Sequence, residues 1–177
     1  MRLTPHQIAV IILTLTSVQY SGGTALADPP RSDVQLQTID YRKLGDLVKA
    51  QRGKVVVVDV WASYCVPCKR EFPNLVRMYG QYAADGLVCL SVTVDKEAQH
   101  EAALAFLRKQ KATFNNYRLT DEEAVWQKAW KISGPPAVFV FDRNGKRAAR
   151  FDGEDEKRPV NYDEIEVIVR KLLRPGA

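Results

Sequence analysis

Two kinds of hydrophobic pattern follow one another along the chain: continuous apolar runs and stripes with helical spacing. The run 55–61 consists of valines around one aspartate and ends in a tryptophan, and a second apolar run occupies 87–94. Such runs are typical of strands that are buried on both faces of a parallel sheet. Segment 66–82 between them has helical spacing, and we expect Pro73 to bend it. These segments predict a β–α–β unit with parallel strands and a right-handed crossover.

Further elements are predicted on both sides of this unit. A helix is expected after Asp95, followed by a short strand at 117–119. Thr120 and Glu123 have the spacing of a capping box, which would open a helix with Trp126 and Trp130 in the core. A helix is predicted at 41–50, and a last helix is predicted to be capped by Asn161 and Glu164. Between them, strands 137–141 and 146–151 are predicted to form a hairpin around an Asn-Gly turn.

The first residues have the three parts of a secretory signal peptide. Arg2 is a positive charge, 8–18 is an apolar stretch, and Ala25-Leu26-Ala27 has the small–x–small pattern of a cleavage site. The apolar stretch is shorter than the ~20 residues that span a bilayer. An uncleaved membrane anchor is the alternative interpretation.

We therefore predict a signal peptide at 1–27, a flexible arm at 28–34 and one domain at 35–177. This organisation implies an exported protein of the periplasm or cell envelope. The formal net charge is +5, but the basic residues are scattered among 21 acidic ones. This distribution gives no reason to expect a nucleic-acid-binding or membrane-binding surface.

Two of the three cysteines are separated by only two residues. Cys65 and Cys68 follow the first buried strand, at the predicted start of a helix. The N-terminus of a helix favours a thiolate, and Lys69 and Arg70 add positive charge. A disulfide that closes so small a loop stabilises the fold little, so reactivity explains the pair better.

The spacing allows Cys65 to attack a substrate disulfide and Cys68 to resolve the mixed disulfide that forms. The alternatives are a permanent structural bridge or half of a zinc site. Zinc usually takes four ligands, and only Cys89 and His100 remain as soft candidates after 1–27 is removed. We therefore expect no metal and no cofactor, and Cys89 is predicted to be a buried free thiol.

At this point a resemblance becomes specific. Residues 61–73, Trp-Ala-Ser-Tyr-Cys-Val-Pro-Cys-Lys-Arg-Glu-Phe-Pro, resemble the signature of bacterial envelope thiol–disulfide oxidoreductases of the TlpA/ResA kind, within the thioredoxin superfamily. Residues 133–137, Ser-Gly-Pro-Pro-Ala, resemble the cis-proline loop of that family. The resemblance covers 36–175. It implies an α/β thioredoxin-like fold with a mixed central sheet, helices on both faces and a helical insertion before the cis-proline loop, for which 95–131 has room.

Two carboxylates are candidate proton carriers. Asp59 lies inside the run of valines, and burial is expected to raise its pKa. The resemblance implies that Asp59 accepts the proton of Cys68, and that Glu71 helps to set the acidity of the cysteines. The alternatives are a strand-end charge in water for Asp59 and a solvated helix face for Glu71.

Four more residues are candidates for substrate binding. The resemblance implies a cis peptide bond before Pro136 and a position facing the cysteine pair. The preceding residue pairs with the substrate backbone in the family, and Pro135 has no N–H to donate. Trp61 and Tyr64 are expected to shape the rim of the site.

By resemblance, the chain is a reductase of protein disulfides outside the cytoplasm. A membrane thiol transporter would supply its electrons, apocytochrome c would be a client, and the chain would act as a monomer. The alternatives are a disulfide oxidase or isomerase of the DsbA type, a metal-binding thioredoxin-like chaperone, and a structural domain with a permanent bridge.

Overall fold

The computed structural model describes residues 33–153 and 159–174. The predicted signal peptide at 1–27 and most of the arm predicted at 28–34 lie outside these ranges. Within the described ranges, every helix is too short or too polar to cross a membrane.

Strands and helices alternate along most of the described chain. Their bounds are β1 Gln37–Ile39, α1 Tyr41–Ala50, β2 Val55–Trp61, α2 Val66–Tyr82, β3 Leu87–Thr93, α3 His100–Gln110, β4 Asn115–Leu119, α4 Glu123–Trp130, β5 Ala137–Phe141, β6 Arg147–Asp152 and α5 Tyr162–Leu173. A short 3₁₀ turn, Glu97–Gln99, precedes α3.

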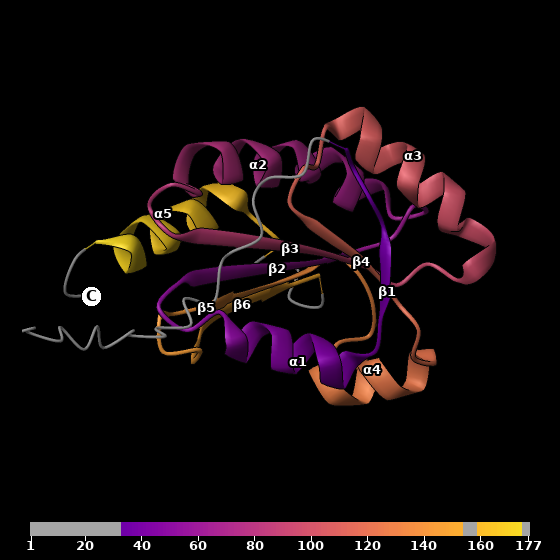
Figure 1. Cartoon of the computed structure of the whole chain (residues 1–177). Coiled ribbons are helices and arrows are strands. Elements are labelled where there is room, and N and C mark those ends of the chain that lie inside the picture. The colour runs from indigo at the N-terminus through magenta and orange to yellow at the C-terminus, as the bar shows by residue number, and fades with distance from the viewer. Residues whose placement is uncertain (1–32, 154–158, 175–177) are drawn as a thin grey trace, which may run out of the picture.

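The strands form one mixed sheet in the order β1-β4-β3-β2-β5-β6. The first four are parallel to one another, whereas β5 runs antiparallel to both β2 and β6. Both faces of the sheet carry helices: α2, α3 and α5 cover one face, and α1 and α4 cover the other (Figure 1). The predicted thioredoxin-like fold is confirmed, and its insertion contains the parallel strand β4 between two helices.

The central strand β2 explains why its sequence is so apolar. All seven of its residues are buried, because helices cover both sides. Val56, Val58 and Val60 pack against the α1 and α4 side. Val55, Val57 and Trp61 pack with α2, α3 and α5. Asp59 therefore points to the same side as α2, among apolar neighbours.

Several local predictions differ from the structure, and the strand predicted at 117–119 begins two residues earlier, at Asn115. Strand β1 has no counterpart among the predicted elements, since it is three residues long and pairs only along β4. The capping box is wrong: Glu122 is the N-cap of α4 and makes no side-chain cap. Thr120 instead extends the pairing of β4 with β1, because its N–H and its hydroxyl both donate to the carbonyl of Ile39. The hairpin is present, with its second strand shifted by one residue at each end.

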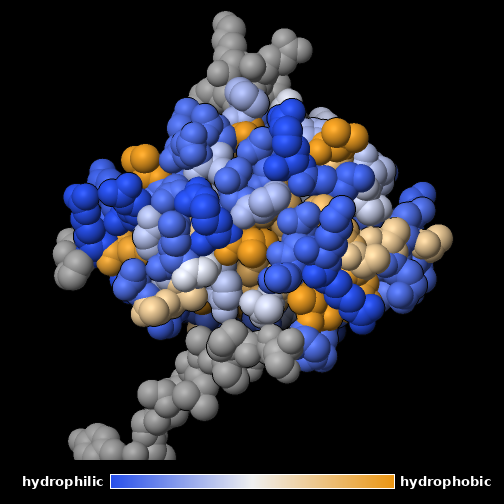
Figure 2. Space-filling model, turned by 90° about the horizontal axis from the view of Figure 1, so that it is seen from above, coloured by the Kyte–Doolittle hydropathy of each residue, from blue (hydrophilic) through white to orange (hydrophobic). Residues whose placement is uncertain are grey.

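The surface above α2 is mainly hydrophilic. Figure 2 shows this side, on which hydrophobic areas are small and separated by polar ones. Among the described residues, the large hydrophobic side chains that are exposed are Tyr64, Val66, Val125 and Val167. Two of them flank Cys65.

Candidate functional site

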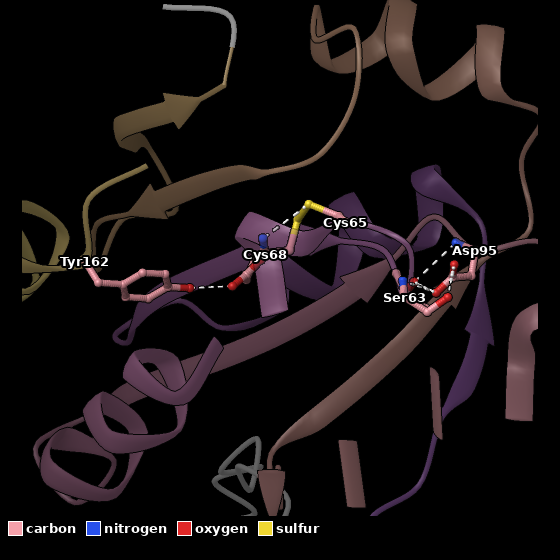
Figure 3. Close-up of a disulfide and its surroundings, with 7 residues drawn as sticks. Ser63, Cys65, Cys68, Asp95 and Tyr162 are labelled. Carbon is pink, nitrogen blue, oxygen red and sulfur yellow. Dashed lines mark hydrogen bonds between the residues drawn. A yellow bond between two sulfur atoms is a disulfide. The ribbon is translucent and has the colours of Figure 1, made fainter. Parts of the chain in front are cut away.

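A disulfide joins Cys65 and Cys68 at the N-terminus of α2 (Figure 3). Cys65 is the N-cap residue, with an extended backbone, and its Sγ accepts the backbone N–H of Cys68 at 3.3 Å. Pro67, in the first turn, has no N–H that would need a partner. An N–H directed at the sulfur stabilises a thiolate after reduction, so the helix start supplies the electrostatics that the sequence predicts.

The loop that carries Cys65 is held by a carboxylate from the neighbouring strand. Asp95 follows β3 and is only 2% exposed. It accepts the N–H of Ser63 at 2.8 Å, the hydroxyl of Ser63 at 2.9 Å and the hydroxyl of Thr93 at 2.6 Å (Figure 3). These bonds fix the turn between β2 and α2. Sequence reasoning did not identify this support, for which the only local signal is a carboxylate that directly follows an apolar run.

Asp59 is the second buried carboxylate near the cysteine pair. It is 5% exposed, and the hydroxyl of Tyr162 donates a short hydrogen bond to its Oδ2. Burial raises the pKa of Asp59 from 3.8 to about 7, and the bond from Tyr162 limits the rise. The expected burial and the direction of the pKa shift are both confirmed. A carboxyl group with this pKa can take up and release a proton near neutral pH.

Glu71 lies one turn beyond Cys68 on α2 and is partly exposed. Its carboxylate accepts hydrogen bonds from Arg70 at 3.1 Å and from Asn74 at 3.2 Å. It also acts electrostatically on Tyr162, so it lies on the side of α2 that faces this group. Of the two candidate carboxylates, Asp59 is therefore the buried one and Glu71 the one in contact with solvent.

The loop before β5 completes the surroundings of the disulfide. The peptide bond between Pro135 and Pro136 is cis, as the sequence predicts. Ala137 of β5 pairs with Val60 of the antiparallel neighbour β2, so the two prolines lie beside the end of β2, where the chain turns toward Cys65. Both prolines are partly buried, and the carbonyl of Pro136 accepts the N–H of Gly153 at 3.1 Å.

The two aromatic residues expected at the rim occupy different environments. Tyr64 is 66% exposed beside Cys65, as a rim residue should be. The position expected for Trp61 is wrong: its side chain is completely buried, donates to the hydroxyl of Ser91 at 2.8 Å and packs against Phe72 and Phe106. It leaves no surface for a substrate because α2 and α3 cover it.

The third cysteine is a buried free thiol, as predicted. Burial raises the pKa of Cys89 well above its usual value, and the nearby Asp59 adds to this effect. Such a thiol is unreactive in the folded protein. Among the residues that the structure describes, no three His, Cys, Asp or Glu side chains are grouped as a metal site would require.

Comparison with known proteins identifies the family. The model of the Redoxin family matches residues 32–165, which is most of the chain. The chain belongs to the Redoxin family. Sporulation thiol-disulfide oxidoreductase A of Bacillus subtilis is a relative that is 24% identical over 149 residues, covering 81% of this chain and 87% of the relative. The thiol:disulfide interchange protein HelX of Rhodobacter capsulatus is 27% identical over 150 residues, covering 85% of this chain and 78% of HelX.

Other relatives agree with this placement of the Redoxin-family chain. A putative thiol:disulfide interchange protein DsbE from Chlorobium tepidum has a solved structure with a TM-score of 0.58 and 31% sequence identity, and the match covers 70% of this chain and 83% of that one. Protein DipZ of Mycobacterium tuberculosis is 31% identical over 141 residues, but this chain spans only 18% of its length. The chain is thus a thiol–disulfide oxidoreductase of the thioredoxin superfamily, similar to ResA and its relatives.

Proposed function

We propose that this chain is an exported reductase of protein disulfides, with Cys65 as the attacking thiol. The observation that carries the proposal is the Cys65–Cys68 disulfide at the N-terminus of α2. Both cysteines belong to the same core cluster, with Cys65 7% and Cys68 4% exposed, but Cys65 is the N-cap and stands between the exposed side chains of Tyr64 and Val66. This position at the end of the helix, beside two exposed side chains, supports Cys65 as the thiol that a substrate meets first.

The reaction starts from the reduced pair. The thiolate of Cys65 attacks one sulfur of the substrate disulfide, and the other substrate sulfur leaves as a thiolate. Cys68 then gives its proton to the carboxylate of Asp59 and attacks the sulfur of Cys65. The mixed disulfide breaks, the second substrate sulfur leaves, and the Cys65–Cys68 disulfide forms. The substrate gains two electrons from the pair. A separate dithiol protein must then reduce the Cys65–Cys68 disulfide before the next cycle.

Further parts of this proposal come from the sequence and from the relatives. Residues 1–27 are proposed as a signal peptide, which places the domain in the periplasm or cell envelope. A protein of known structure with the same fold, 19% identical to this chain, is a secreted disulfide oxidoreductase of Mycobacterium tuberculosis. A membrane thiol transporter is the proposed electron donor, and apocytochrome c is a proposed client. The chain is proposed to act as a monomer.

The redox potential of the pair separates a reductase from an oxidase. Equilibration with glutathione buffers, followed by alkylation and mass analysis, measures this potential directly. A reductase should have a redox potential close to that of thioredoxin, about −270 mV. The potential of an oxidase of the DsbA type is about −120 mV. A value near the oxidase would overturn the proposed direction. If the Cys65–Cys68 disulfide resists dithiothreitol, it is a structural bridge, and the proposed enzymatic function is also wrong.

The proposed proton acceptor is tested by two conservative variants. Asp59→Asn should slow turnover in an insulin-reduction assay more than Glu71→Gln does, because only Asp59 is buried with the pair. The reverse ranking would assign the proton to Glu71 instead.

The proposed role of Pro135 concerns substrate affinity. Pro135 offers a substrate strand its carbonyl but no N–H. Pro135→Thr restores a backbone N–H donor. The variant should therefore hold a substrate peptide more tightly in the trapped mixed disulfide. Unchanged affinity would show that this backbone position makes no contact.

A further inference from the structure

A tyrosine from the far end of the chain lies against Asp59 in the protein core. Tyr162 is the first residue of α5 and is 3% exposed. Its hydroxyl donates to Oδ2 of Asp59, 103 positions earlier in the sequence. In the described part of the chain this is the only hydrogen bond to the Asp59 side chain. Figure 3 shows the ring of Tyr162 extended toward the disulfide, with the hydroxyl leading.

The other groups around this pair do not stabilise a negative charge. Cys89 from β3 and Glu71 from α2 face Tyr162, together with Asp59 from β2. These groups are either neutral or negative, and β5 presents Val138 opposite Asp59. Burial disfavours the carboxylate form of Asp59. Among the neighbours that the structure describes, the hydroxyl of Tyr162 is the group that favours the carboxylate.

We propose that Tyr162 is a positioning residue for the resolving step, whose hydroxyl orients the Asp59 carboxylate and holds it in the charged form that can accept the proton of Cys68. This inference deepens the proposed function and rests on the proposed role of Asp59. The proton passes from Cys68 to Asp59, while the proton of Tyr162 stays on its own oxygen. Tyr162 therefore acts through Asp59 and does not touch the reacting sulfurs.

The hydrogen bond has a measurable consequence. A bond to a charged acceptor is strong enough that its loss should raise the pKa of Asp59 by about one to two pH units. Since that pKa is about 7, the ionised fraction at pH 7 should fall from about one half to about one tenth or less. The resolving step should slow by about 5-fold or more at pH 7 and recover as the pH rises toward 9.

Tyr162→Phe removes the hydroxyl and keeps the buried ring. A matched control is Tyr82→Phe, which also removes a tyrosine–carboxylate hydrogen bond, the one from Tyr82 to Glu166 at 2.7 Å, away from the cysteine pair. The experiment follows resolution of a trapped mixed disulfide against pH, and titrates Asp59 by carbon-13 NMR of its carboxyl group. Tyr162→Phe should shift both curves upward, and Tyr82→Phe should shift neither.

A second variant moves the same curves in the opposite direction. Fluorotyrosine at position 162 has a more acidic hydroxyl and is a stronger donor, so the titration of Asp59 should move to lower pH. Asp59 titrating at the wild-type pH in both Tyr162 variants would overturn the inference, whatever the rate. If Asp59→Asn resolves the mixed disulfide as fast as wild type does, the proposed proton role fails separately. A wild-type pair that reduces no disulfide defeats the proposed function itself.

Discussion

Replacing Asp59 by asparagine is expected to change the pH dependence of stability. In the folded protein, burial raises the pKa of Asp59 to about 7, while its ordinary value is 3.8. Between these two values the folded state binds a proton that the unfolded state has lost. Stability therefore falls as the pH rises from about 4 to about 7, and it stays low above pH 7.

The size of the effect follows from the shift. About three pH units at 1.36 kcal/mol per unit correspond to about 4 kcal/mol of destabilisation above pH 7. Only part of this change falls in a convenient range, and between pH 5 and pH 8 it amounts to about 2.5 kcal/mol. Asparagine cannot ionise, so it abolishes this dependence. Its amide N–H groups need partners in the core, but that cost of about 1–3 kcal/mol is the same at every pH.

Urea unfolding of the oxidised protein at several pH values measures this difference. The free energy of unfolding of Asp59→Asn minus that of wild type should grow by about 2.5 kcal/mol from pH 5 to pH 8. Asp46→Asn, which changes an exposed aspartate on α1, is the control and should show no such trend. A difference that does not change with pH, or that shrinks as the pH rises, would refute the assigned burial of a titrating carboxyl group.

Three further predictions concern the surroundings of the site. Asp95→Ala removes the two hydrogen bonds that hold Ser63. The free energy of unfolding in urea should fall by at least about 2 kcal/mol, and the reduced protein should attack a model disulfide more slowly. Cys89 should resist iodoacetamide at pH 8 in the native protein and react once urea unfolds it, as peptide mass analysis would show; rapid native labelling would contradict its burial. Phe72→Ala should cost about 3–5 kcal/mol in the same unfolding assay, since Phe72 is fully buried between aromatic rings.

The parts of the fold that sequence patterns predict are those that carry their signal locally. Strand β2 and helix α2 have continuous runs and helical spacing of their own, and their bounds agree with the prediction. Strand β1 does not, because its three residues become a strand only through pairing with β4, far along the chain. Thr120 has the spacing of a capping box, but its hydroxyl donates a hydrogen bond to the carbonyl of Ile39 instead.

The site divides in the same way. The cysteine pair, the buried Asp59 and the cis-proline can be read from short motifs, since each depends on nearby residues. The packing of Trp61 against Phe106 is not predicted, because no local pattern in the sequence indicates that α3 covers the end of β2. Tyr162 could not be found, since it joins Asp59 across 103 positions and follows an ordinary helix cap.

The central claim is that the start of α2 makes Cys65 an acidic, reactive thiol. It is tested most directly by the rate of alkylation of Cys65 in the reduced protein, followed by peptide mass analysis across pH 4–10. The account predicts a half-maximal rate well below the value of about 8.5 for free cysteine. A midpoint at about 8.5, with the reactivity of an ordinary thiol, would contradict it.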